Sequence, residues 1–279
     1  MRRRLSMPWS VRLAIGLLAV LALAGAGANL LSPYDFSYTD LLARLQPPVF
    51  AGGSWKHLLG TDQLGRDQLS RLLFGIRTSL LIAAFGTAFG AAIGTALGFV
   101  SAHFRGWVEQ VVMAAVDVQA AMPFIIIVLF VMATAGTSLW VFLLLIGFAG
   151  WETYARLARG LVLSASRQNY VLALEGLELG WGRIYLRHIL PNIASALIVQ
   201  LTLNFPATVL LETGLSFLGL GVQPPNTSLG VMLGDGRSYL LQAWWIAVIP
   251  GAVIFATTLS MSVFGDWLRD RLDPVSRDR

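Results

Sequence analysis

The stretch Ser79–Ala102 reads SLLIAAFGTAFGAAIGTALGFVSA and contains no charged side chain. A helix needs about 20 mostly apolar residues to cross the ~30 Å hydrocarbon core of a bilayer, so we predict a transmembrane helix here. Gly86, Gly90, Gly94 and Gly98 recur within it every four residues and therefore lie on one face of the helix. A face without side chains lets another backbone approach closely. The row predicts tight helix packing, but it does not indicate which helix is the partner.

Composition extends this prediction to the whole chain. Of the 279 residues, 56% are hydrophobic and 13% are charged, and the mean hydropathy is +0.69. An ordinary soluble domain has roughly 25% charged residues, so this chain has too few to cover a water-facing surface. We predict an all-α integral membrane protein with six transmembrane helices, at Leu13–Leu31, Ser79–Ala102, Val111–Ala135, Leu139–Ala155, Ala194–Leu215 and Ala243–Phe264.

The first span has a second interpretation. Arg2–Arg4, the apolar run and the small residues Ala24–Ala28 are also typical of a secretory signal peptide. The apolar run continues past the small residues to Leu31, which favours an uncleaved anchor.

Lysine and arginine are unevenly distributed between the segments that connect the spans. If the N-terminus is cytoplasmic, the inner segments hold 14 of these residues and the outer segments hold 6. Cytoplasmic loops of membrane proteins carry the excess of positive charge, so we predict that both termini are cytoplasmic. The outer residues would be Arg44, Lys56, Arg66, Arg71, Arg77 and Arg237.

This orientation divides the chain into two parts. Residues 1–78 are predicted to form an anchor helix and an extracytoplasmic segment, and residues 79–279 a five-helix core with a cytoplasmic loop at about 156–192. The apolar spacing of Leu69, Leu72, Leu73 and Ile76 predicts one apolar face of a short helix. We expect it on the outer surface, in contact with the membrane or packed on its own domain.

Enzyme chemistry finds little support in the residues. The chain has no cysteine, and His57, His103 and His188 lie in three separate segments, so we predict no catalytic, cofactor-binding or metal-binding residues. The single lysine, Lys56, is not part of a G-x-x-x-x-G-K-[ST] phosphate loop, so any ATP hydrolysis must occur on another chain. The net charge of +5 comes from short arginine clusters between apolar runs, a pattern that does not indicate a nucleic-acid partner.

Acidic residues within or beside the spans are the first candidates for function. An intramembrane carboxylate costs about 2.5–3.5 kcal/mol on insertion scales and is therefore a functional candidate. Asp117 and Glu212 are candidates for the translocation path, although either can instead bond neighbouring helices. Glu152 lies at an inner border and can pair with Arg156 one turn later.

The segment between the fourth and fifth spans is too long for a simple turn. It runs from Trp151 to Asn192 and contains helix-favouring residues and five arginines, with Pro191 just before the next span. A structured cytoplasmic loop of this kind is a place where a soluble motor protein can act on the spans.

Several motifs along the chain resemble those of one family of membrane proteins. They include LLGTDQLGRD at 58–67, ETGLSFLGLGVQPP at 212–225 and GDWLRDRLDP at 265–274. Asp117, Pro123, Trp151, Tyr154 and Arg156 fit the third and fourth spans of the same family. In this order and spacing, they resemble the permease subunits of ATP-binding-cassette (ABC) importers. The similarity is greatest to the second, C-type permease of the dipeptide, oligopeptide and nickel systems.

This resemblance implies a type I ABC importer fold in the bacterial cytoplasmic (inner) membrane. A homologous permease would form the translocation pathway with this chain. Two ATPase subunits, or one fused pair, would bind ATP and Mg²⁺, and an extracytoplasmic solute-binding protein would deliver the solute. Peptides are the expected substrate, with nickel chelates and other small solutes as alternatives. A self-contained secondary transporter or channel is the other interpretation, but such proteins usually have internal repeats, and none is evident.

The cytoplasmic loop of this family carries a Glu-Ala-Ala…Gly…Ile-x-Leu-Pro pattern whose short coupling helix docks on the ATPase. Here Arg183, His188 and Pro191 fit the second half of the pattern. In the first half Leu172, Leu174 and Glu178 replace the usual Glu, second Ala and Gly, and only Ala173 is kept. We nevertheless expect the segment to contact the ATPase. Apolar contacts would come from Leu172, Leu174 and Leu177, with Glu175, Gly176, Glu178 and Gly180 in the same segment.

Overall fold

The computed structural model describes residues 7–177 and 179–272, and the regular elements in these ranges are helical. The single β-type pairing in the described residues is an isolated bridge between Thr61 and Asp67. The α-helices are α1 (Trp9–Ala26), α2 (Ala28–Leu31), α3 (Gln68–Phe104), α4 (Gly106–Ala121), α5 (Phe124–Ala135), α6 (Leu139–Phe148), α7 (Trp151–Ala165), α8 (Asn169–Gly176), α9 (Trp181–Ile184), α10 (Leu190–Phe217), α11 (Leu229–Gly236) and α12 (Trp245–Leu272). Short 3-10 turns occupy Leu41–Ala43, Val49–Ala51 and Arg237–Tyr239, and a π-helical turn, η3, occupies Tyr185–Ile189.

Five stretches in the described residues are long and apolar enough to cross a membrane as continuous or nearly continuous helices. They are Trp9–Ala26, Gln68–Phe104, Leu139–Ala165, Trp181–Phe217 and Trp245–Leu272. The pair α4–α5 passes the same test together, and the total is six when this bent pair is counted as one span. The chain is therefore an all-helical, multi-pass membrane protein.

The predicted span at Val111–Ala135 is not one continuous helix. Helices α4 and α5 meet at an angle of 95°, with Met122 in an extended conformation at φ −97° and ψ 135°. Pro123 explains the break, because proline has no N–H to continue the helix and disfavours helical geometry in the residue before it.

The predicted short helix at Leu69–Ile76 is not a separate element, but of its two predicted positions, packing on the protein's own domain is confirmed. Leu69, Leu72, Leu73 and Ile76 belong to the first turns of α3, which continues without a break to Phe104. Leu72 and Ile76 are buried in a cluster with residues of α1, α11 and α12. This apolar face is covered by the protein's own helices.

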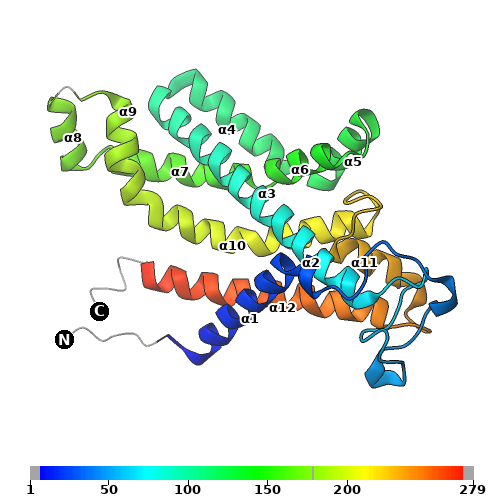
Figure 1. The fold of residues 1–279 in the computed structure, drawn as a ribbon. Helices are drawn as coiled ribbons and strands as arrows, with labels where there is room; N and C mark the ends of the chain where they lie inside the picture. The colour runs from blue at the N-terminus through cyan, green and yellow to red at the C-terminus, as the bar shows by residue number, and fades with distance from the viewer. Residues whose placement is uncertain (1–6, 178, 273–279) are drawn as a thin grey trace.

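The helices place the two sets of connecting segments at opposite ends of the molecule. Figure 1 shows α8 and α9 at one end, together with the start of α1 and the end of α12. The segment between α2 and α3 and the helix α11 lie at the other end. This arrangement agrees with the division of the chain by arginine and lysine, in which the end with α8 is cytoplasmic.

Labelling of single cysteines will test this orientation. Trp55 is 81% exposed and Leu177 is 70% exposed, and the chain has no native cysteine. We expect a membrane-impermeant maleimide to label Trp55→Cys in intact cells and to label Leu177→Cys only after the cells are opened. Labelling of Leu177→Cys but not Trp55→Cys in intact cells would invert the topology.

A buried charge network attaches the outer segment to α11. Arg71 is 1% exposed. It donates to Asp62 at 2.5 Å and to Asp235 of α11 at 2.9 Å. Arg66 donates to the same two carboxylates at 2.6 and 3.3 Å. Buried charges are stable only when they are paired in this way, so the network fixes the outer end of α3 against α11. The motif at 58–67 contains Asp62 and Arg66, but its spacing did not predict these contacts.

Candidate functional site

The glycine row of α3 faces α6 and α7. A Cβ atom on Gly90 would lie 3.1 Å from the carbonyl oxygens of Gly147 and Ala149. On Gly94 it would overlap the carbonyl oxygen of Trp151, and on Gly98 it would lie 2.7 Å from both the Ala155 oxygen and the Ala158 Cβ. On Gly86 it would overlap the side chain of Ile146. The absence of side chains on this face is therefore what allows α3 to lie against the backbone of the α6–α7 span.

Glu212 of α10 is completely buried and joins three elements. Ser79 of α3 donates to its Oε2 at 2.9 Å, and Ser216, one turn later in α10, donates to its Oε1 at 2.8 Å. The Ser79 hydroxyl also accepts the backbone N–H of Leu229 at the start of α11, at 3.1 Å. In this conformation Glu212 holds helices together and does not line an open path.

Replacing Glu212 will separate a structural role from a role in transport. Glu212→Ala leaves two buried hydroxyls without their acceptor and opens a cavity, and it should cost about 3 kcal/mol of stability. Glu212→Gln keeps a carbonyl acceptor of similar size and should stay within about 1 kcal/mol of wild type. The measurement is the apparent Tm of the purified subunit in detergent. Normal stability but lost transport in Glu212→Gln would instead place this carboxylate on the substrate path.

Asp117 of α4 lies on an exposed surface. Its side chain is 74% exposed, and its Oδ1 accepts from Arg156 of α7 at 3.2 Å. The proposed pairing of Glu152 with Arg156 is therefore wrong, since Arg156 reaches across to α4. The Oε2 atom of Glu152 is buried and has no hydrogen-bond partner among the described residues. Asp117 is the more accessible of the two candidate carboxylates, and it lies six residues before Pro123, where the helix breaks.

The predicted coupling segment lies on α8 and the turn after it, at one end of the molecule. Leu172 is 52% exposed and Leu177 is 70% exposed, and Ala173, Gly176 and Gly180 are exposed beside them. Leu174 instead packs against a cluster that contains Val171, Val162 and Ile184, and Glu175 is half-buried. The outward apolar surface therefore consists of Leu172 and Leu177, and Leu174 helps to hold α8 in place. Glu178 lies outside the described residues.

The second half of the loop forms the connection back into the membrane. Arg183 lies in α9, His188 in the π-helical turn η3, and Pro191 at the start of α10, directly after η3. Tyr185 in η3 donates to or accepts from His103 of α3 at 3.0 Å, and its ring lies 5.6 Å from that of Trp181. These contacts fix α9 and η3 to the end of α3.

No group of three or more His, Asp or Glu side chains in the described residues is placed to bind a metal ion.

Comparison with known families defines the class of protein. A family model described as the inner membrane component of binding-protein-dependent transport systems matches residues 94–277. Since this match spans more than half of the chain, the chain belongs to that family, and it has the type I ABC importer permease fold.

Individual relatives extend the similarity to nearly the whole chain. The chain is 36% identical over 272 residues to the oligopeptide transport system permease protein OppC of Mycobacterium bovis, covering 95% of this chain and 91% of OppC. It is 40% identical over 248 residues to the dipeptide transport system permease protein DppC of Escherichia coli K12, covering 88% of this chain and 83% of DppC. Among solved structures, an inward-facing MetNI methionine ABC transporter is similar in fold, with a TM-score of 0.58 and 18% identity over 72% of this chain and 96% of that chain.

Proposed function

We propose that this chain is one permease subunit of an ATP-driven importer of di- or oligopeptides in the bacterial inner membrane. The observation that carries the proposal is the continuous similarity to two peptide permeases over 95% and 88% of the chain. The similarity includes the outer segment, the spans and the cytoplasmic loop, so all the parts that such a subunit needs are represented.

The chain works with partner proteins. A homologous permease completes the translocation pathway, and two ATPase subunits or one fused pair bind ATP and Mg²⁺ against the cytoplasmic loop. An extracytoplasmic solute-binding protein delivers the peptide to the outer segment. The exposed Leu172 and Leu177 support an ATPase partner, because apolar side chains on a cytoplasmic loop favour contact with a protein surface over contact with water.

The transport step is a change between outward- and inward-facing states of the permease pair. In this chain, the glycine row joins α3 rigidly to α6 and α7, and the buried Glu212 joins α3 to α10. These helices therefore move as one body when the ATPases push on α8. The broken span α4–α5 and the exposed Asp117 are the parts free to face the partner permease and the solute.

Transport into proteoliposomes tests the proposal. The chain is reconstituted with its partner permease and the ATPase subunits, and labelled peptide is added outside with the binding protein. We expect uptake that requires ATP and the binding protein and that unlabelled peptide, but not a nickel chelate, abolishes. Uptake by this chain alone, driven by an ion gradient, would show a secondary transporter instead.

A further inference from the structure

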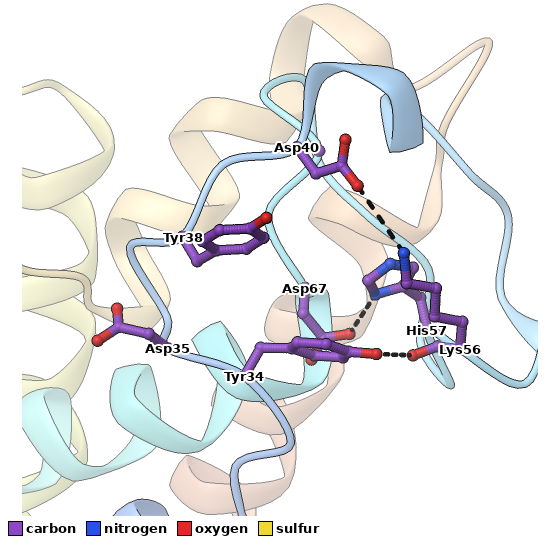
Figure 2. A pocket seen from close by; sticks show the side chains of 8 residues that line it. Tyr34, Asp35, Tyr38, Asp40, Lys56, His57 and Asp67 are labelled. Atoms are coloured by element: carbon purple, nitrogen blue, oxygen red, sulfur yellow. Dashed lines mark hydrogen bonds and ion pairs between the residues drawn. The ribbon is translucent and has the colours of Figure 1, made fainter.

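The outer segment contains a cavity of about 380 Å³. Figure 2 shows its lining side chains, which include Tyr34, Tyr38, Asp40, His57 and Asp67. All the lining residues lie between positions 34 and 67, outside the transmembrane spans. None of them belongs to the glycine row, the buried charge network or the coupling segment.

A buried histidine with one unused nitrogen forms part of the cavity wall. His57 and Asp67 are 4% and 3% exposed, and the His57 Nδ1 lies 2.9 Å from the Asp67 Oδ1. Asp67 caps α3, because its Oδ2 accepts the backbone N–H and the hydroxyl of Ser70, each at 2.8 Å. A carboxylate in this role is an acceptor, so Nδ1 carries the hydrogen, and in the tautomer that this bond selects Nε2 is an acceptor.

No group in the described part of the chain occupies that acceptor. The Nε2 atom of His57 is buried without a hydrogen-bond partner. A buried polar atom without a partner is unfavourable and rare in folded proteins. This nitrogen therefore marks a place where an additional hydrogen-bond donor would be bound favourably.

The charges around the cavity favour a positive donor. Three carboxylates, those of Asp35, Asp40 and Asp67, line the cavity together with a single ammonium, that of Lys56, which lies 3.8 Å from Asp40 and is 60% exposed. Hydrogen bonds from the side chain and backbone of Ser37 lower the pKa of Asp35, so this carboxylate keeps its negative charge at neutral pH.

Aromatic rings in the cavity wall also favour a bound cation. The Tyr34 ring lies 5.1 Å from the His57 ring, and its hydroxyl donates to the Lys56 carbonyl at 3.1 Å, which fixes its orientation. Tyr38 stands beside it in Figure 2. Tyrosine faces attract cations. Because no three carboxylate or histidine groups of the described residues converge to hold a metal ion, the fitting ligand is an organic cation, an alkylammonium or a guanidinium.

We propose that this cavity receives a lysine or arginine side chain of the extracytoplasmic solute-binding protein when that protein docks. The inference rests on the proposed function, which supplies the partner. The cavity lies at the end of the molecule opposite α8 (Figure 1), where a protein arriving from outside makes contact. A free peptide is a poorer occupant, because the cavity takes no residue from α4, α5, α10 or α12 and so lies off the route through the spans.

Two charge substitutions with opposite expected effects test this assignment. In Asp40→Asn, the amide oxygen can still accept the Leu42 N–H that caps the turn at Leu41–Ala43, so folding is preserved while the charge is lost. Lys56→Gln removes the cation that competes for Asp40. The complete transporter is placed in lipid nanodiscs without ATP, and the Kd of fluorescent, peptide-loaded binding protein is measured. We expect Asp40→Asn to raise the Kd about tenfold and Lys56→Gln to lower it about threefold.

Arg44→Gln is the matched control, because Arg44 is exposed on the same segment but does not line the cavity. Its Kd should change less than about twofold. An unchanged Kd in both Asp40→Asn and Lys56→Gln would overturn the assignment, and so would an equal effect of Arg44→Gln, which would indicate only a general electrostatic field.

A second titration, with labelled peptide and no binding protein, distinguishes the source of the cation. Weaker peptide binding in Asp40→Asn with an unchanged binding-protein Kd would identify the cation as the peptide's own amino terminus and overturn docking. The proposed function is judged separately, on the wild-type transporter, whose failure to take up peptide would refute it whatever the cavity binds.

Discussion

Gly94→Leu should abolish accumulation of the folded subunit. Any Cβ at this position overlaps the carbonyl oxygen of Trp151 and lies 2.8 Å from the Cβ of Tyr154, and both neighbours belong to a packed helix that cannot yield locally. Even Gly94→Ala should cost about 3 kcal/mol, at the upper end of the range for overpacking. The measurement is the yield and apparent Tm of the purified subunit, by size-exclusion chromatography after stepwise heating.

Glycines with open surroundings are the controls for this prediction. Gly160 in α7 and Gly214 in α10 have no heavy atom within 4 Å of an added Cβ. Alanine at either position should leave the Tm unchanged or raise it slightly, because alanine is favoured over glycine in a helix by up to about 1 kcal/mol. Equal stability of Gly94→Ala and Gly160→Ala would contradict the close packing of α3 on α7.

Replacing both Leu172 and Leu177 by Asp should reduce ATP-driven peptide uptake more than tenfold while the permease pair still assembles. Both side chains are exposed on the cytoplasmic loop, so the change leaves the fold intact and places two charges where an apolar contact with the ATPase is proposed. Loss of one or two central apolar contacts of an interface typically costs about 2 kcal/mol or more of binding energy. The measurements are peptide uptake into proteoliposomes and retention of the ATPase on the immobilised permease pair.

Two further variants distinguish coupling from a general effect of charge or of misfolding. Leu241→Asp makes the same change at a fully exposed leucine outside the cytoplasmic loop and should transport normally. Leu174→Asp places a charge in the apolar cluster beneath α8 and should lower both the Tm and peptide uptake. Full uptake by Leu172→Asp/Leu177→Asp would show that the partner permease alone transmits the conformational change of the ATPases to the spans.

Local sequence was sufficient to predict the membrane class, the helical content and the positions of most spans. Each span is decided by its own run of apolar residues, because the bilayer imposes the same length and polarity on every helix that crosses it. The glycine row was visible for a similar reason, since four residues at one spacing must share a face whatever packs against them. The sequence left open whether lipid or protein covers the outer turns of α3, because an apolar face is the same pattern in both cases.

The tertiary structure alone decided which groups meet. Three contacts join residues that are far apart in the chain. They are the contact of the glycine row with α6 and α7, the hydrogen bond of Ser79 to the buried Glu212, and the pairing of Arg156 with Asp117 instead of Glu152. Leu174 turned inward while Leu172 and Leu177 stayed exposed, although the three leucines look equivalent in sequence. His57 lines a cavity and keeps an unused nitrogen, which no spacing along the chain indicates. Contacts of this kind depend on how helices cross and loops return, and the spacing of residues along one helix carries no information about either.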